Sequence, residues 1–362
     1  VIVAKWFLPI FLKRGIFTMP QFLEERFDKR VKTVMAFFWL IVFVFVNLTS
    51  ILYLGALTIQ SVMGIPLLYG VIGLALFAVV YSINGGLKAV ALTDVIQVFF
   101  LVGGGLITTY IALDLLGAGE GVLKGCETLY LKTEDKFHLI LDPSHPGYMD
   151  IPGLSVILGG LWVANLYYWG CNQYIIQRAL AAKNIKEAQW GMAFAGVIKL
   201  LIPLLVVIPG IAAFALDAPL SKPDEAYPWL LGNLLPVGVK GIAFAALTAA
   251  IVSSLASMMN SISTIFTMDI YQVYIRPEGD ASHLVRVGKM TSLVAMLIGV
   301  CIAPLLSGLD QAFQYIQEFT GFVSPGALSI FLAGFFYKRA TSNGALVSAV
   351  ASFVLSFVFK YL

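Results

Sequence analysis

The sequence predicts an all-α polytopic membrane protein, and three observations indicate that class. Hydrophobic residues make up 59% of the 362 residues, and charged residues only 12%. The mean hydropathy of +0.90 lies well away from that of ordinary soluble domains. Long apolar runs recur along the chain, and the polar connections between them alternate in their content of basic residues. A water-soluble protein is therefore excluded.

The apolar runs define the expected membrane-crossing helices. After a partial run at 1–12, they cover 33–62, 66–82, 90–116, 152–177, 189–216, 239–267, 288–306, 310–337 and 344–361. No Pro-rich linker or low-complexity tract divides the chain, so we expect one transmembrane domain over 1–362. The long connection 117–150, with its acidic residues, prolines and glycines, is expected to be a structured extracellular loop.

Basic residues in alternate connections predict the orientation. The poorer set holds Lys124, Lys132, Lys136, Lys222 and Lys240. The richer set holds Lys13, Arg14, Arg26, Lys29, Arg30, Lys32, Lys88, Arg178, Lys183, Lys186, Arg276, Arg286, Lys289, Lys338 and Arg339. Because positive loops stay in the cytoplasm, the richer set is inside, and every crossing then alternates in direction.

Lys199 lies in an otherwise apolar stretch, WGMAFAGVIKLLIPLLVVIPGIAAFAL, that is long enough to cross a bilayer. A charged side chain is costly in hydrocarbon and usually faces a polar cavity, where it handles a solute or an ion. Counting residues from the helix ends places Lys199 and Asn165 near the midplane, where inverted-repeat transporters bind their solutes. The pattern predicts a protein that moves a solute across a membrane. A structural ion pair or a hydrogen bond to a carbonyl is the alternative role for Lys199.

The run 152–177 contains GGLWVANLYYWGCNQYIIQR. At helical spacing Asn165, Tyr168, Trp169 and Asn172 share one face. Asn165 can donate and accept hydrogen bonds, which suits a hydroxyl-rich solute, and an aromatic ring can cover the apolar face of a sugar. The alternative is that the amides bond neighbouring helices and the rings belong to an interfacial belt.

Gln317 lies in QAFQYIQEFTG, with Phe313 one turn before it on the same face. A glutamine in the membrane can contact a solute. It can equally well hydrogen-bond a neighbouring helix.

The run 239–267 carries small and polar residues at three- and four-residue steps. Close helix packing is the ordinary explanation of such a stripe. Ser253, Ser254 and the carbonyl of Ala250 also supply neutral oxygens at the spacing a small hard cation needs. Asp94 opens the run 90–116, where it can stabilise the helix N-terminus or serve as a waypoint for a cation leaving toward the cytoplasm.

Four segments together carry a resemblance to a known family. They are YSINGGLKAVALTDVIQ, NLYYWGCNQYIIQR, AAIVSSLASMMNS and QAFQYIQEFTGFVSPG, and the resemblance extends over essentially the whole chain. The sequence resembles the sodium/solute symporter family, in particular its bacterial sodium/galactose and sodium/glucose branch. This implies the five-plus-five inverted-repeat fold of the sodium/leucine transporter, in which each repeat begins with an interrupted helix. The chain then lacks the first core helix: 1–116 is an incomplete first repeat, 151–337 the second repeat, and 338–362 an additional helix.

The resemblance also implies a sugar site. Asn165, Lys199 and Gln317 match the positions that hydrogen-bond the sugar. Tyr168 matches the aromatic gate on the inner side of the sugar, with Trp169 beside it, and Phe313 matches a ring on the outer side.

The resemblance further implies sodium as the coupling ion. Ala250, Ser253 and Ser254 match the sodium site, and Asp94 matches an aspartate linked to the sodium exit path. Sodium and sugar then favour the same conformation, so a sodium gradient drives sugar uptake by alternating access. The expected partners are a galactose- or glucose-type sugar, sodium and the lipid bilayer of a bacterial inner membrane, with no nucleic acid. The oligomeric state stays open.

In this family the first core helix and the start of the second supply further groups to both sites, including a glutamine and a glutamate. Those segments would precede Val1, so the sites named above are expected to be half-sites. We do not expect residues 1–362 to transport by themselves.

Two alternatives to a sugar symporter stay open. One is a sodium symporter for proline, pantothenate or a monocarboxylate, and the other is a sugar sensor that does not transport. An enzyme is not expected, because the sequence contains no HExxH, GxSxG or Walker pattern. The histidines, His138, His145 and His283, fall in polar connections, and the three cysteines form no CxxC pair, so no metal or redox centre is predicted.

Overall fold

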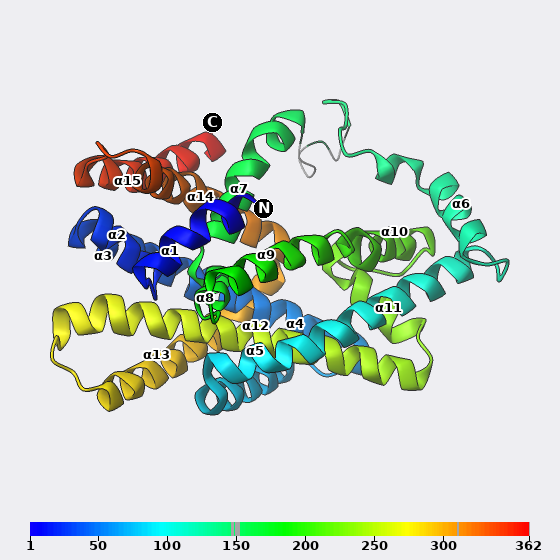
Figure 1. Ribbon diagram of the computed structural model, residues 1–362. Helices are drawn as coiled ribbons and strands as arrows, with labels where there is room; N and C mark the ends of the chain where they lie inside the picture. The colour runs from blue at the N-terminus through cyan, green and yellow to red at the C-terminus, as the bar shows by residue number, and fades with distance from the viewer. Residues whose placement is uncertain (146–147, 149–152, 310, 362) are drawn as a thin grey trace.

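The computed structural model describes residues 1–145, 148, 153–309 and 311–361, and the regular structure within these ranges is entirely helical (Figure 1). Short π and 3-10 segments (η) join or extend several of the α-helices. In chain order the elements are η1 (Val3–Phe7), α1 (Leu8–Arg14), α2 (Met19–Arg26), α3 (Lys29–Ile41), η2 (Val42–Leu48), α4 (Thr49–Met63), α5 (Leu67–Leu116), α6 (Val122–Lys132), η3 (Glu134–Phe137), η4 (Val156–Gly160), α7 (Leu161–Gly170), α8 (Gln173–Leu180), α9 (Ile185–Lys199), η5 (Pro203–Val207), α10 (Ile208–Ala215), η6 (Pro223–Glu225), α11 (Ala226–Asn233), α12 (Val237–Thr264), η7 (Ile265–Ile275), α13 (Ala281–Ile302), η8 (Ala303–Gly308), α14 (Ala312–Phe336) and α15 (Ser342–Tyr361).

The continuous run Lys29–Met63, formed by α3, η2 and α4, is part of the largest hydrophobic cluster. The Asp28 side chain caps its start by accepting hydrogen bonds from two backbone amides, and Gly64 ends it in the left-handed conformation at φ 69°. Trp39 is fully buried, and its indole N–H donates a 3.0 Å hydrogen bond to the hydroxyl of Tyr167 on α7. This bond satisfies both polar groups inside the apolar core.

α5 is helical throughout but cannot be straight. The hydroxyls of Tyr81 and Thr93 are hydrogen-bonded to each other. Twelve residues of straight helix would separate them by about 18 Å. The chain therefore turns back between them, and the two predicted runs 66–82 and 90–116 are the two arms of this bend.

The run 152–177 is interrupted between α7 and α8, which agrees with the interrupted helix that the resemblance implies at the start of the second repeat. α7 ends at Gly170, and the backbone amides of Cys171 and Asn172 both donate to the carbonyl of Tyr167, at 2.8 and 3.1 Å. The Asn172 side chain accepts a 3.0 Å hydrogen bond from the amide of Tyr174 and so caps α8. Asn172 is thus a buried capping residue and does not share a solute-facing surface with Asn165.

The run 189–216 is bent, because the chain turns by 40° between Ile185–Lys199 and Pro203–Ala215. Pro203 has no amide hydrogen with which to bond the carbonyl of Lys199, four residues earlier. The amides of Leu200 and Leu201 bond three residues back, as in a tightened last turn. Lys199 is therefore the last residue of α9 and not a mid-helix residue.

Most of the nine full apolar runs correspond to membrane-length helices of the described chain. Six helices are long and apolar enough to cross a membrane, and the bent pair can make a seventh crossing. The two remaining runs are the shorter apolar arm Leu67–Ile83 and the interrupted helix that ends at Leu180. The protein is thus multi-pass.

The connection 117–150 is structured where it is described, as expected. α6 continues away from the main body of helices beyond the end of α5 (Figure 1). Leu129 of α6 is buried in a small cluster with Ala212 of α10 and Leu230 of α11. Gly125 allows this approach, because a Cβ at that position would collide with the carbonyl oxygen of Leu113 on α5 and lie 2.6 Å from its carbonyl carbon.

Gly125→Ala is expected to destabilise the protein by about 1–3 kcal/mol, because the added carbon meets backbone atoms that cannot rotate away. Thermal unfolding of the purified protein in detergent measures the change. Gly103→Ala on α5 is the matched control, since its Cβ would enter open space and alanine favours a helix. Equal melting temperatures for the two variants would contradict the packing described here.

Candidate functional site

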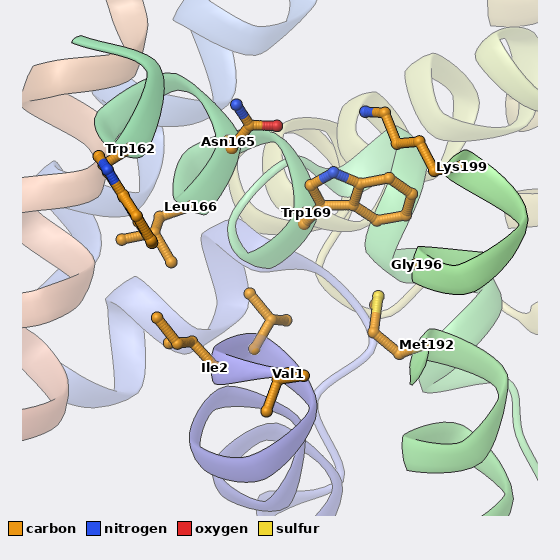
Figure 2. Close-up of a pocket in the computed structure, with 10 residues that line it drawn as sticks. Val1, Ile2, Trp162, Asn165, Leu166, Trp169, Met192, Gly196 and Lys199 are labelled. Carbon is orange, nitrogen blue, oxygen red and sulfur yellow. The ribbon is translucent and has the colours of Figure 1, made fainter. Parts of the chain in front are cut away.

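A cavity of about 410 Å³ lies between α7, α9 and the first residues of the chain (Figure 2). Its volume falls in the range typical of small-molecule sites. It is lined by Val1, Ile2, Val3, Trp162, Asn165, Leu166, Trp169, Met192, Gly196 and Lys199. Three predicted site residues, Asn165, Trp169 and Lys199, are thus brought to one cavity.

Lys199 is held by aromatic rings. Its ammonium nitrogen lies 4.9 Å from the ring centroid of Trp169 and 5.9 Å from that of Tyr168. The two rings meet edge to face, with centroids 5.7 Å apart. Cation–π contacts stabilise an ammonium without using its hydrogens as hydrogen-bond donors. Since Lys199 makes no ion pair within the described chain, the structural ion pair considered above is not what holds it.

Asn165 complements Lys199. Its side-chain nitrogen donates a 2.8 Å hydrogen bond to the carbonyl of Leu161, one turn earlier on α7. Figure 2 shows its side-chain oxygen directed toward the part of the cavity where the Lys199 ammonium lies, with the Trp169 indole beneath both. An acceptor, a donor and an aromatic face therefore surround one space, an arrangement that suits a small neutral solute with several hydroxyls.

The other predicted solute residues are less closely connected to this cavity. Tyr168 does not line it but contacts two lining residues, Lys199 and Trp169, and its own side chain is exposed. Gln317 and Phe313 are exposed on α14, which packs against α7, but neither lines the cavity. Their role in binding solute stays a prediction.

A polar cluster joins α5, α8 and α12. The carboxylate of Asp94 accepts a hydrogen bond from the Ser253 hydroxyl and forms a 2.7 Å ion pair with Arg178. The same guanidinium nitrogen donates a 2.6 Å hydrogen bond to the hydroxyl of Ser257, whose carbonyl accepts a 3.2 Å bond from Gln177. Two residues predicted on separate helices, Asp94 and Ser253, thus touch each other.

The sequence pattern does not identify Arg178 as a functional residue. It places Arg178 only among the basic residues of the cytoplasmic connections. The available signal was electrostatic: a lone carboxylate at a membrane helix needs a partner. The partner in the structure, Arg178, is 84 residues away in sequence.

The remaining sodium candidates lie on the same helix. Ala250 and Ser254 are partly buried on α12, at helical spacing from Ser253. The oxygens of these residues and of Asp94 are of the type that binds hard cations. Within the part of the chain that is described, no cluster of three His, Cys, Asp or Glu residues could hold a metal ion. Sodium binding by these residues stays a prediction.

Trp169 connects the two regions. It lines the cavity with Lys199 and also a second cavity of about 400 Å³, which extends along α8 and α9 to Arg178. Met192 also lines both cavities, so these two side chains lie where the cavities adjoin.

Comparison with known proteins identifies the family. The model of the sodium:solute symporter family matches residues 1–351. The chain is 54% identical to the sodium/glucose cotransporter of Vibrio parahaemolyticus over 379 aligned residues, which cover all of this chain and 70% of that protein. It is 34% identical to the uncharacterized symporter YidK of Escherichia coli (strain K12), covering all of this chain and 64% of that protein, and 32% identical to the sodium/myo-inositol cotransporter 2 of Bos taurus, covering 99% of this chain and 57% of that protein.

A solved structure confirms the fold. The substrate-bound, outward-open structure of a Na+-coupled sialic acid symporter matches with a TM-score of 0.83 and 23% sequence identity, over 98% of this chain and 73% of that one. The helical architecture expected from the motifs is that of a sodium-coupled symporter of the sodium/leucine transporter type. The chain belongs to the sodium:solute symporter family.

Proposed function

We propose that this protein is a sodium-coupled symporter for a sugar of the glucose or galactose type. The cavity shared by Asn165, Trp169 and Lys199 is the observation that carries the proposal. The ammonium of Lys199 donates hydrogen bonds to sugar hydroxyls, the oxygen of Asn165 accepts one, and the indole covers the apolar face of the ring. The 54% identity to a protein named as a sodium/glucose cotransporter supports the same substrate class.

In this proposal, residues of α12 bind the sodium ion. Ser253 and Ser254 supply hydroxyl oxygens, Ala250 supplies a carbonyl oxygen, and Asp94 provides the negative charge that draws the ion onward. In the structure Arg178 is paired with that charge, so an arriving sodium ion competes with the guanidinium for Asp94.

Coupling follows if sodium and sugar stabilise the same conformation, because a sodium gradient then shifts the population that binds sugar. The path from Lys199 past Trp169 to Arg178 is where the sugar would leave on the inner side. The similarity to a Vibrio transporter supports a bacterial inner membrane as the location.

Uptake into proteoliposomes tests the function directly. The full-length protein is expected to accumulate radiolabelled galactose or glucose only under an inward sodium gradient. Potassium in place of sodium is the control, and myo-inositol, proline and a monocarboxylate serve as competitors. Sodium-driven uptake of one of the competitors with no sugar uptake would overturn the assignment of the solute. Sugar binding without accumulation would indicate a sensor.

Lys199→Gln is expected to raise the KM for sugar by about 10- to 100-fold, the loss expected for a hydrogen bond from a charged donor. The half-saturating sodium concentration is expected to change little. Lys183→Gln is the matched control, because Lys183 is exposed in the turn between α8 and α9. An unchanged KM in Lys199→Gln, with normal expression, would remove Lys199 from the sugar site.

If sodium and Arg178 compete for Asp94, replacing Arg178 and replacing Asp94 should shift the half-saturating sodium concentration in opposite directions. Arg178→Gln leaves the carboxylate free and is expected to lower the half-saturating sodium concentration about fivefold, as for a partly exposed ion pair. Asp94→Asn is expected to raise it. Sodium-activation curves of uptake measure both. Lys124→Gln, which breaks the exposed 2.9 Å pair with Glu127, should leave the curve unchanged. A rise in both Asp94→Asn and Arg178→Gln would exclude competition.

A further inference from the structure

An apolar groove of about 640 Å³ lies between α3–η2, η7 and α13, away from the cavities described above. The three walls belong to three of the membrane-length helices. Its floor includes Val44, Ile262 and Ala295, which are all buried, whereas Met290 and Val294 on its rim are more than half exposed. The groove therefore opens on the lipid-facing surface.

One end of the groove is polar and basic. His283 and Arg286, in the first turns of α13, line this end, and the remaining lining is almost wholly apolar. The ring of His283 is fixed by a 2.9 Å hydrogen bond between its Nε2 and the hydroxyl of Tyr271. Arg286 is exposed and has no hydrogen-bond or ion-pair partner in the described chain.

The length of the groove matches one leaflet of a bilayer. Arg286 and Ile298 both line it and are twelve residues apart on α13, or about 18 Å along the helix. One leaflet contributes roughly 15 Å of the hydrocarbon core. A molecule with a polar head at Arg286 and a hydrocarbon chain along α13 would span this distance.

The charges near the polar end favour an anionic head. Arg276 follows η7, and the ammonium of Lys29 lies 4.8 Å from the ring of Tyr274. Like Lys29 and Arg276, Glu278 and Asp280 do not line the groove, whereas Arg286 does; Asp280 accepts a 2.5 Å hydrogen bond from the Ser282 hydroxyl. Lys29, Arg276 and Arg286 also belong to the set assigned to the cytoplasmic side, where anionic lipids attract basic side chains.

We propose that this groove is a binding site for an anionic phospholipid of the cytoplasmic leaflet. The phosphate lies at Arg286, and an acyl chain lies on the floor formed by Val44, Ile262 and Ala295. The lipid would pack against η7, the continuation of the helix that carries Ser253, and would join it to α13.

Lipid binding to the purified, delipidated protein tests the proposal. Native mass spectrometry is expected to show tighter binding of phosphatidylglycerol than of phosphatidylcholine with the same acyl chains. Arg286→Gln is expected to weaken phosphatidylglycerol binding about fivefold, the change for one basic side chain at an anionic surface, and to leave phosphatidylcholine unaffected. Arg339→Gln is the matched control, because Arg339 is an exposed arginine of the same basic set outside the groove.

A second variant tests the acyl chain. Val294→Trp fills the exposed rim of the groove, and it is expected to reduce the binding of both lipids without lowering the melting temperature of the lipid-free protein. Equal affinity for the two lipids in the unmodified protein would overturn the proposal. So would unchanged phosphatidylglycerol binding in Arg286→Gln, or a helix of another protein retained in the groove in place of lipid.

Discussion

The constraint on which this structure depends is the need to satisfy every backbone polar group inside a bilayer. An unbroken α-helix does so by itself, and it then presents only side chains to its surroundings. Irregular backbone at membrane depth is tolerated only where protein or a polar cavity covers it. Two of the interrupted helices of the described chain, α7–α8 and α9–η5, line the proposed solute cavity together with the first residues of the chain. The candidate site therefore lies between helices whose backbone hydrogen-bond pattern is interrupted.

Each interruption has a local cause and a local compensation. At the first, the carbonyl of Tyr167 accepts two amides and the side chain of Asn172 caps the next helix. At the second, Pro203 removes the donor that would bond the carbonyl of Lys199. Lys199 lies at a helix end against two aromatic rings, which stabilise its charge and leave its hydrogens available as donors.

The Asp94 cluster shows that a charged side chain in a membrane helix must also be satisfied by polar partners. A carboxylate at a membrane helix needs a partner, and Arg178 and Ser253 provide one ion pair and one hydrogen bond from two other helices. Because Arg178 is carried by α8, the inner half of the interrupted helix is fastened to α12 through Ser257. In the proposed mechanism a cation at Asp94 would replace the guanidinium in the ion pair, while the hydrogen bond from Gln177 to the Ser257 carbonyl still joins α8 to α12.

The sequence by itself determined that this is a multi-pass membrane protein and which family it belongs to. It also determined most of the polar residues proposed for the two sites. Hydropathy and the alternation of basic connections depend only on local composition, and residues such as Asn165, Lys199 and Asp94 are conspicuous because lipid would not tolerate them unpaired. Only the tertiary structure decided where the helices break, that Asn172 is a cap, and that Gln317 lies outside the cavity lined by Asn165 and Lys199. It also decided that Arg178 meets Asp94 across 84 residues of sequence. Hydropathy reports how deep a residue lies along a helix, whereas the rotation of one helix against another is set by packing between segments far apart in the chain.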